Sequence, residues 1–157
     1  MGLEAASVPL RARKGRDLQR YEEGQRLVAG CIPIRESRPG RFEILMISSN
    51  KNRNVLTLPK GGWEEDETLE DAAVRETIEE AGVRGELQGP KLGPYSFLSK
   101  RSGKCKAYMY IMKVEEELNE WPEKHVRVRV WCSLEKAINS CKWEWMKEVL
   151  RAKFGEA

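Results

Sequence analysis

The sequence has little of what several common kinds of site require. Histidine occurs once, as His125, and the four cysteines form no Cys-x-x-Cys pair and no Cys/His spacing typical of zinc. No apolar run approaches the roughly 20 residues that a membrane-spanning helix needs. The formal net charge is only +3. These absences argue against a zinc site and a membrane span, and we interpret the cysteines as reduced core residues of an intracellular protein.

What remains has the size and composition of one globular domain. The chain holds 157 residues, of which 40% are hydrophobic and 34% are charged, which suffices to bury a sizeable core. Residues 1–24 lack hydrophobic periodicity and are rich in arginine, so we expect a basic N-terminal arm followed by a single domain over residues 25–154. The arm is either a solvated tail or a segment that folds back onto an anionic substrate, and the sequence supports both interpretations equally.

Hydrophobic patterns predict a series of strands. The first two cover residues 26–34 and 42–49, joined by a Pro39-Gly40 turn, and a short strand follows over 55–58. Two more are expected over 85–98 and 104–114, and an acidic linker over 115–122. In the second of these strands Tyr108 and Tyr110 recur with period two, which favours sheet packing over stacking on a base. Valine and arginine alternate over 125–131, which predicts a strand with an arginine face.

Two helices are expected near the C-terminus. Ser133 predicts the cap of a helix that ends near Ser140, and a last helix is expected over 142–153. A stripe at helical spacing predicts how this last helix packs: Trp143, Met146, Val149 and Leu150.

The most informative stretch is GGWEEDETLEDAAVRETIEEAGV at residues 61–83. It fits the pattern G-x5-E-x7-R-E-U-x-E-E-x-G-U, where U is a bulky aliphatic residue. At roughly 7% usage per residue type, seven fixed positions coincide by chance about once in 10^8 windows. The fixed positions are Gly61, Glu67, Arg75, Glu76, Glu79, Glu80 and Gly82.

The same stretch predicts a metal site on a helix. Thr68 and Gly82 are suitable caps for a helix over about 69–81, and Glu76, Glu79 and Glu80 then share one face. A solvated acidic face is the alternative, but like charges at i and i+4 destabilise a helix by about 0.2–0.5 kcal/mol. A Mg²⁺ ion, which takes oxygen ligands, would relieve that repulsion.

This pattern resembles the Nudix box, so the chain is similar to the Nudix hydrolases. Thr77 occupies a position that is usually aliphatic, and its hydroxyl then needs a hydrogen-bond partner. The resemblance implies an α/β (α+β) Nudix fold, with a mixed β-sheet sandwiched between helices. It also implies Mg²⁺, or Mn²⁺ in its place, held by the Lys60 carbonyl and by Glu76 and Glu80. Glu79 would act as the general base, and Arg75 and Glu67 would brace the helix.

Sequences outside the box narrow the resemblance to one subgroup. PKGG, SSNK and WPEKHVRVRVWCSLEKA look like the diphosphoinositol polyphosphate and diadenosine polyphosphate phosphohydrolases, in a plant-like form, over about residues 13–145. Where animal relatives have glycine, this chain has Lys60. The resemblance implies a set of substrate contacts that is mostly cationic: Arg16, Arg26, Ser49, Asn50, Lys51, Arg53, Lys104, Lys106 and Arg127.

The expected activity is hydrolysis of the phosphoanhydride bond of inositol pyrophosphates, because scattered cations suit phosphates that point in many directions. A diadenosine polyphosphate hydrolase, with adenine on Tyr95, Tyr108 or Trp63, is one alternative. A non-catalytic module that binds an anion or RNA is another. We expect a monomer with a small-molecule polyphosphate substrate and neither a membrane nor a nucleic-acid partner. The expected location is the cytoplasm or nucleus, with organelle targeting as an alternative because residues 5–20 are arginine-rich.

Overall fold

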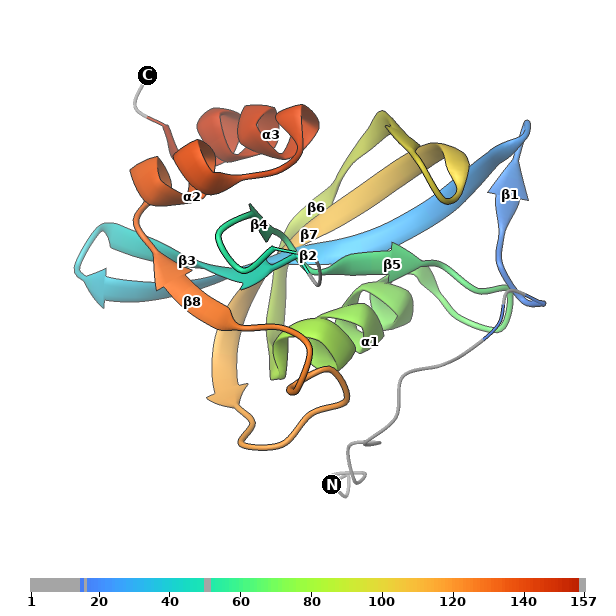
Figure 1. Ribbon diagram of the computed structural model, residues 1–157. Coiled ribbons are helices and arrows are strands. Elements are labelled where there is room, and N and C mark those ends of the chain that lie inside the picture. The colour runs from blue at the N-terminus through green and yellow to red at the C-terminus, as the bar shows by residue number, and fades with distance from the viewer. Residues whose placement is uncertain (1–14, 16, 50–51, 156–157) are drawn as a thin grey trace.

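The computed structural model describes residue 15 and residues 17–49 and 52–155. A mixed β-sheet lies between helices, which confirms the predicted fold class (Figure 1). The strands are β1 (Tyr21–Glu22), β2 (Gln25–Arg38), β3 (Arg41–Ser48), β4 (Leu56–Thr57), β5 (Lys60–Gly62), β6 (Val83–Ser99), β7 (Gly103–Glu117) and β8 (Arg129–Cys132). The helices are α1 (Leu69–Ala81), α2 (Leu134–Ser140) and α3 (Glu144–Phe154).

Strand β2 is the centre of the sheet. The strand order is β4-β3-β2-β7-β6, with β1 and β5 also on β2 and β8 on β3. The pairing of β2 with β7 is parallel, whereas its pairings with β1, β3 and β5 are antiparallel. The predicted turn between β2 and β3 is present, and Gly40 has the positive φ of +78° that this turn requires. Strands β5 and β3 pair with different parts of the same edge of β2: β5 with residues 28–30 and β3 with residues 34–38. The edge therefore changes partner where the box begins.

The two faces of the sheet carry separate cores. Helix α1 covers one face, where its buried alanines Ala72 and Ala73 pack against Ala29, Cys31 and the tyrosines of β7 (Figure 1). Helices α2 and α3 cover part of the opposite face through side chains such as Met146. Tyr110 is buried in the α1 core and Tyr108 packs beside it, so the prediction of sheet packing is confirmed.

Helix α1 begins and ends as its sequence predicts. The Thr68 hydroxyl accepts a hydrogen bond from the Asp71 amide at 3.1 Å, and Gly82 ends the helix with φ of +64°. A Cβ at Gly82 would lie 2.4 Å from the Trp121 ring, so glycine is needed there for space as well. The unusual Thr77 is buried, and its hydroxyl donates to the Ala73 carbonyl at 2.8 Å. This bond satisfies the hydroxyl inside the core.

The strand predicted over 125–131 is wrong in its first half. Strand β8 begins only at Arg129, and residues 123–127 form a turn in which the amides of Val126 and Arg127 both donate to the Glu123 carbonyl. Val126 and Val128, which the alternation placed on the strand face opposite the arginines, are 51% and 41% exposed. The physical reason is that Arg127 and Arg129 find partners inside the protein, as described below.

Two other boundaries differ from the prediction. Helix α3 begins at Glu144, and Trp143 precedes it as a half-buried residue, so Trp145 rather than Trp143 continues the buried stripe. Glu115 to Glu117, expected in a linker, end strand β7. None of the helices in the described part of the chain has the length and apolar content to span a bilayer.

The four cysteines are free and buried, as predicted: Cys31, Cys105, Cys132 and Cys141. Burial raises the pKa of Cys31 to about 12, so its thiol is protonated at neutral pH.

Candidate active site

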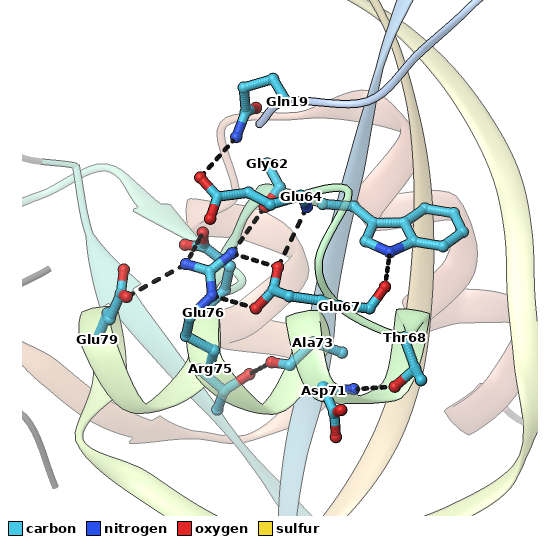
Figure 2. Close-up of polar contacts among 12 residues, drawn as sticks. Gln19, Gly62, Glu64, Glu67, Thr68, Asp71, Ala73, Arg75, Glu76 and Glu79 are labelled. Atoms are coloured by element: carbon cyan, nitrogen blue, oxygen red, sulfur yellow. Dashed lines mark hydrogen bonds and ion pairs between the residues drawn. The ribbon is translucent and has the colours of Figure 1, made fainter. Parts of the chain in front are cut away.

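Arg75 is the centre of a carboxylate cluster on α1 (Figure 2). Its Nη2 donates to Glu67 at 2.9 Å, and its Nη1 donates to Glu76 at 2.9 Å and to Glu79 at 3.2 Å. Nη2 also reaches the carbonyl of Gly62 at 2.9 Å. Burial lowers the pKa of the guanidinium, but the three carboxylates outweigh burial and raise that pKa above its ordinary value. One cation therefore orients three anions and ties the helix to β5.

The loop before α1 holds Glu67 in place. One oxygen of Glu67 accepts the amide of Glu64 at 3.1 Å, and its backbone carbonyl accepts the Trp63 indole N–H at 3.0 Å (Figure 2). The Glu64 carboxylate accepts from Gln19 at 3.2 Å. Carboxylate oxygens of Glu64, Asp66 and Glu67 also lie within 4.8 Å of one another. Gln19 thus connects the chain before β1 to the box.

The first box glycine makes room for Glu76. A Cβ at Gly61 would lie 2.1 Å from Glu76 Oε1, so any side chain there would displace this carboxylate. Burial and then repulsion from Glu80 raise the pKa of Glu76 well above its usual range, although Arg75 opposes the shift. Glu76 therefore lies buried directly against the backbone of β5.

Glu80 faces the same backbone from the next turn of α1. It accepts the Lys60 amide at 3.1 Å, and its other oxygen lies 3.7 Å from an Arg127 nitrogen. Burial raises the pKa of Glu80 to about 7; Arg127 and Lys60 oppose the shift, and Glu123 adds to it. The cations near Glu80 thus offset only part of the cost of burying its charge.

These residues fit a divalent metal ion. Two carboxylates lie beside β5, Glu76 against Gly61 and Glu80 against the Lys60 amide, and carboxylate oxygens are hard ligands that Mg²⁺ prefers. Burial raises the pKa values of Glu76 and Glu80, and the nearby cations Arg75 and Arg127 offset only part of each shift. A divalent cation would favour the charged form of both carboxylates.

The segment after β7 holds the last turn of α1. The amide of Glu123 donates to the Glu79 carbonyl at 3.0 Å. Arg129 donates to the carbonyls of Ala81 at 3.2 Å and Gly82 at 3.0 Å and lies 4.1 Å from the centre of the Trp121 ring. The Gly82 carbonyl also accepts the Leu118 amide at 2.8 Å, so backbone and side-chain donors together satisfy the carbonyls at the helix end. Arg129 therefore supports the turn of α1 that carries Glu79 and Glu80.

A small recess of about 120 Å³ adjoins Glu80 on the side facing α3. Lys60, Arg127, Lys142, Ser49 and Trp143 line it. Arg127 donates to the Ser48 carbonyl at 2.9 Å and pairs with Glu123. Burial lowers the pKa of Lys60. The negative charge of Glu80 opposes this shift, and the positive charges of Arg26 and Arg127 add to it. We name this group of side chains the cationic recess.

The structure brings together only part of the expected substrate contacts. Ser49 and Arg127 line the cationic recess, and Arg26 lies near enough to Lys60 to affect its pKa. Arg53 and Lys104 are exposed, and Lys106 pairs with Glu22 of β1 at 2.8 Å. Three of the expected residues lie outside the described part of the chain: Arg16, Asn50 and Lys51.

Several residues of the site have no signal in the sequence. Gln19 and Lys142 belong to no motif, Glu123 lies in the WPEKHVRVRVWCSLEKA stretch without an assigned role, and Arg129 was assigned to a strand face. Each reaches the site from far along the chain: Gln19 contacts Glu64, 45 residues away. The Val-Arg alternation was the one available signal for Arg129, and it indicated a different environment.

Comparison with known proteins agrees with the fold. The family profile described as NUDIX domain matches residues 24–153. The chain therefore belongs to the Nudix family, a group of hydrolases that act on pyrophosphate bonds and generally use a divalent metal such as Mg²⁺.

Two relatives and one solved structure illustrate this membership. The chain is 50% identical over 155 residues to Nudix hydrolase 16, mitochondrial, of Arabidopsis thaliana, covering 88% of this chain and 85% of that protein. It is 37% identical over 118 residues to diphosphoinositol polyphosphate phosphohydrolase 3-beta of Bos taurus, covering 74% and 69%. A C. elegans Ap4A hydrolase in a binary complex has a similar fold, with a TM-score of 0.64 and 24% identity over 80% of this chain and 92% of that one.

Proposed function

We propose that the protein is a Mg²⁺-dependent hydrolase of the phosphoanhydride bond in diphosphoinositol polyphosphates. The observation that carries the proposal is the juxtaposition of the carboxylate cluster around Arg75 with the cationic recess beside Glu80. A carboxylate face suits the metal, and separate cations suit a substrate with several phosphates. The bovine relative named a diphosphoinositol polyphosphate phosphohydrolase supports this substrate class.

In this proposal each carboxylate of α1 has its own task. Glu76, Glu80 and the Lys60 carbonyl hold Mg²⁺, which when bound would neutralise phosphate oxygens and lower the pKa of the attacking water. Glu79 accepts the proton from that water as general base. Arg75 holds Glu76 and Glu79 in their orientations, and Glu67 holds Arg75.

Diadenosine polyphosphates are the competing substrates, and the aromatic side chains argue against them. The Tyr95 ring already stacks on Trp145, with centroids 5.4 Å apart. The Trp63 ring has Arg20 at 4.5 Å, and Tyr108 has Lys91 at 5.1 Å. An adenine would have to compete with these partners or use the opposite ring face.

The carboxylates of α1 argue against the other alternative, a non-catalytic module, because such a module would have no use for a complete metal site.

A substrate panel tests the proposal. We expect the purified protein with Mg²⁺ to hydrolyse inositol pyrophosphates efficiently and long diadenosine polyphosphates more slowly. The panel should include capped RNA and oxidised nucleotides, and each reaction should be repeated with EDTA as the control. Efficient cleavage of one nucleotide together with no cleavage of any inositol pyrophosphate would refute the proposal.

We also propose that the protein is a monomer, and that it works in an organelle rather than in the cytoplasm we first expected. The second part is supported by the arginine-rich residues 5–20 and by the word mitochondrial in the name of the Arabidopsis relative. A fluorescent protein fused after residue 24 tests the compartment, with the fusion lacking residues 1–24 as control. Diffuse cytoplasmic fluorescence from both fusions would reject the organelle.

A further inference from the structure

The cationic recess contains two lysines that the carboxylate cluster does not use. Lys60 Nζ lies 5.1 Å from the centre of the Phe97 ring and 5.2 Å from that of Trp143. Lys142 Nζ lies 5.0 Å from the centre of the same Trp143 ring. Ring faces attract a cation without accepting its N–H groups as a carboxylate would. Both ammonium groups are therefore held near the recess with their donors available.

The partners of these lysines differ from those of the neighbouring arginine. Within residues 15, 17–49 and 52–155, neither Lys60 Nζ nor Lys142 Nζ has a hydrogen bond or an ion pair. Arg127, on the same recess, pairs with Glu123 and donates to the Ser48 carbonyl. Lys60 is half-buried, and an ammonium group there without an oxygen partner loses hydration that an anion could replace, whereas Lys142 is exposed. The two lysines therefore have more unused N–H donors than Arg127 has.

The volume of the recess limits what the lysines can bind. About 120 Å³ corresponds to roughly four water molecules at about 30 Å³ each. That space suits a phosphate group rather than a purine or an inositol ring. Glu80 forms one wall, so a phosphate there would lie beside the carboxylates of α1 and not among them.

We propose that Lys60 and Lys142 form a subsite for a second phosphate group of the substrate, separate from the phosphate that is cleaved at the carboxylate cluster. The identity of the substrate rests on the proposed function, but the anion-binding capacity of the recess does not. Lys60 then determines specificity: it favours substrates that carry a phosphate within reach of the cleaved diphosphate. In this proposal the Lys60 backbone carbonyl holds Mg²⁺ and its side chain binds the second phosphate group.

Calorimetric titration with inositol hexakisphosphate in EDTA tests the subsite without turnover or metal. Lys60→Met keeps an unbranched side chain between Phe97 and Trp143 and removes the charge. Because a hydrogen bond to a charged group is strong, we expect the affinity of Lys60→Met for inositol hexakisphosphate to be about tenfold or more below that of the wild type. Lys142 is exposed, so Lys142→Met should disturb the fold less. It should also lower the affinity. Lys60→Arg should restore most of the affinity.

Lys91→Met is the matched control, because Lys91 also lies 5.1 Å from a ring centre but lines a different recess. Its affinity should equal that of the wild type. Three results would each overturn the subsite. The first is unchanged affinity in both Lys60→Met and Lys142→Met, the second is an equal loss in Lys91→Met, and the third is no binding by the wild type. If binding depends on Lys60 but no inositol pyrophosphate is hydrolysed, the subsite stands and the proposed function fails.

Discussion

The carboxylate cluster and the cationic recess lie side by side but are built differently. Arg75 finds its side-chain partners within eight residues, and its carbonyl partner, Gly62, is 13 residues away. In the recess, Arg127 contacts the Ser48 carbonyl across 79 residues, and Lys142 comes from the segment before α3. The negative half of the site is therefore local in the sequence, whereas the positive half is assembled by the fold.

The two halves also differ in how their charges are compensated. In the cluster, three carboxylates share one guanidinium and are largely buried, so each depends on the others. In the recess, each cation has its own environment: Arg127 has Glu123, and the lysines have aromatic rings. Changes in the cluster should therefore affect stability and catalysis, while changes in the recess should mainly affect substrate affinity.

The largest effect is expected from Glu79→Gln, which removes a basic carboxylate and keeps its size. General-base catalysis contributes typically 10²–10⁴-fold, about 3–5 kcal/mol of barrier, so kcat should fall by that factor at any Mg²⁺ concentration. Glu76→Gln and Glu80→Gln should recover part of their rate as Mg²⁺ is raised. Measuring kcat against Mg²⁺ separates the roles; recovery of Glu79→Gln alone would mean that base and ligand are interchanged.

Arg75→Met should produce the largest loss of stability. It leaves Glu67, Glu76 and Glu79 without their shared cation, and breaking a buried ion pair on one side costs about 3–5 kcal/mol. Urea unfolding measures this free energy directly. Arg151→Met removes a cation paired at 3.7 Å with exposed Glu144 and should change it by about 0.5 kcal/mol or less. Equal losses in the two variants would show that the cluster is no more cooperative than a surface pair.

Arg127→Ala sharpens the comparison from the side of the recess. We expect KM to rise about tenfold with a smaller change in kcat, because the contact is made equally in the ground and transition states. The difference from wild type should shrink at high salt. Arg84→Ala, which breaks an exposed pair with Glu116 at 2.7 Å, is the control. If kcat falls instead and added Mg²⁺ restores it, Arg127 acts by orienting the metal ligand Glu80 and not by binding substrate.

The smallest effect is expected from Thr68→Ala at the start of α1. The lost cap should lower the free energy of unfolding by about 1 kcal/mol without changing KM, since Thr68 lies at the helix end remote from Glu80. Thr68→Ser keeps the hydroxyl and should retain most of the stability. Thermal unfolding and kinetics on the same preparations check both statements. A large KM effect would mean that the cap positions the site and does not only stabilise the helix.

The accuracy of the sequence-based predictions follows the same division. Helix α1 was predicted to the residue, because its caps, its periodicity and its glutamates act within a few turns. The alternation over 125–131 failed, because the partners of Arg127 and Arg129 lie on other elements. Trp143 was assigned to a buried helical stripe, yet it precedes α3 and contacts Lys60 and Lys142. Residues with distant partners leave no short-range pattern.

The sequence by itself determined the family, the order of most elements and the composition of the carboxylate helix, because each depends on spacing within a short segment. Only the tertiary structure decided which cations lie beside that helix, that Glu123 and Arg129 bind its last turn, and that Gln19 binds Glu64 in the loop before it. The physical reason is that charge pairing and burial depend on distance in space. The fold alone brings β5, the segment before β8 and the start of α3 to one recess.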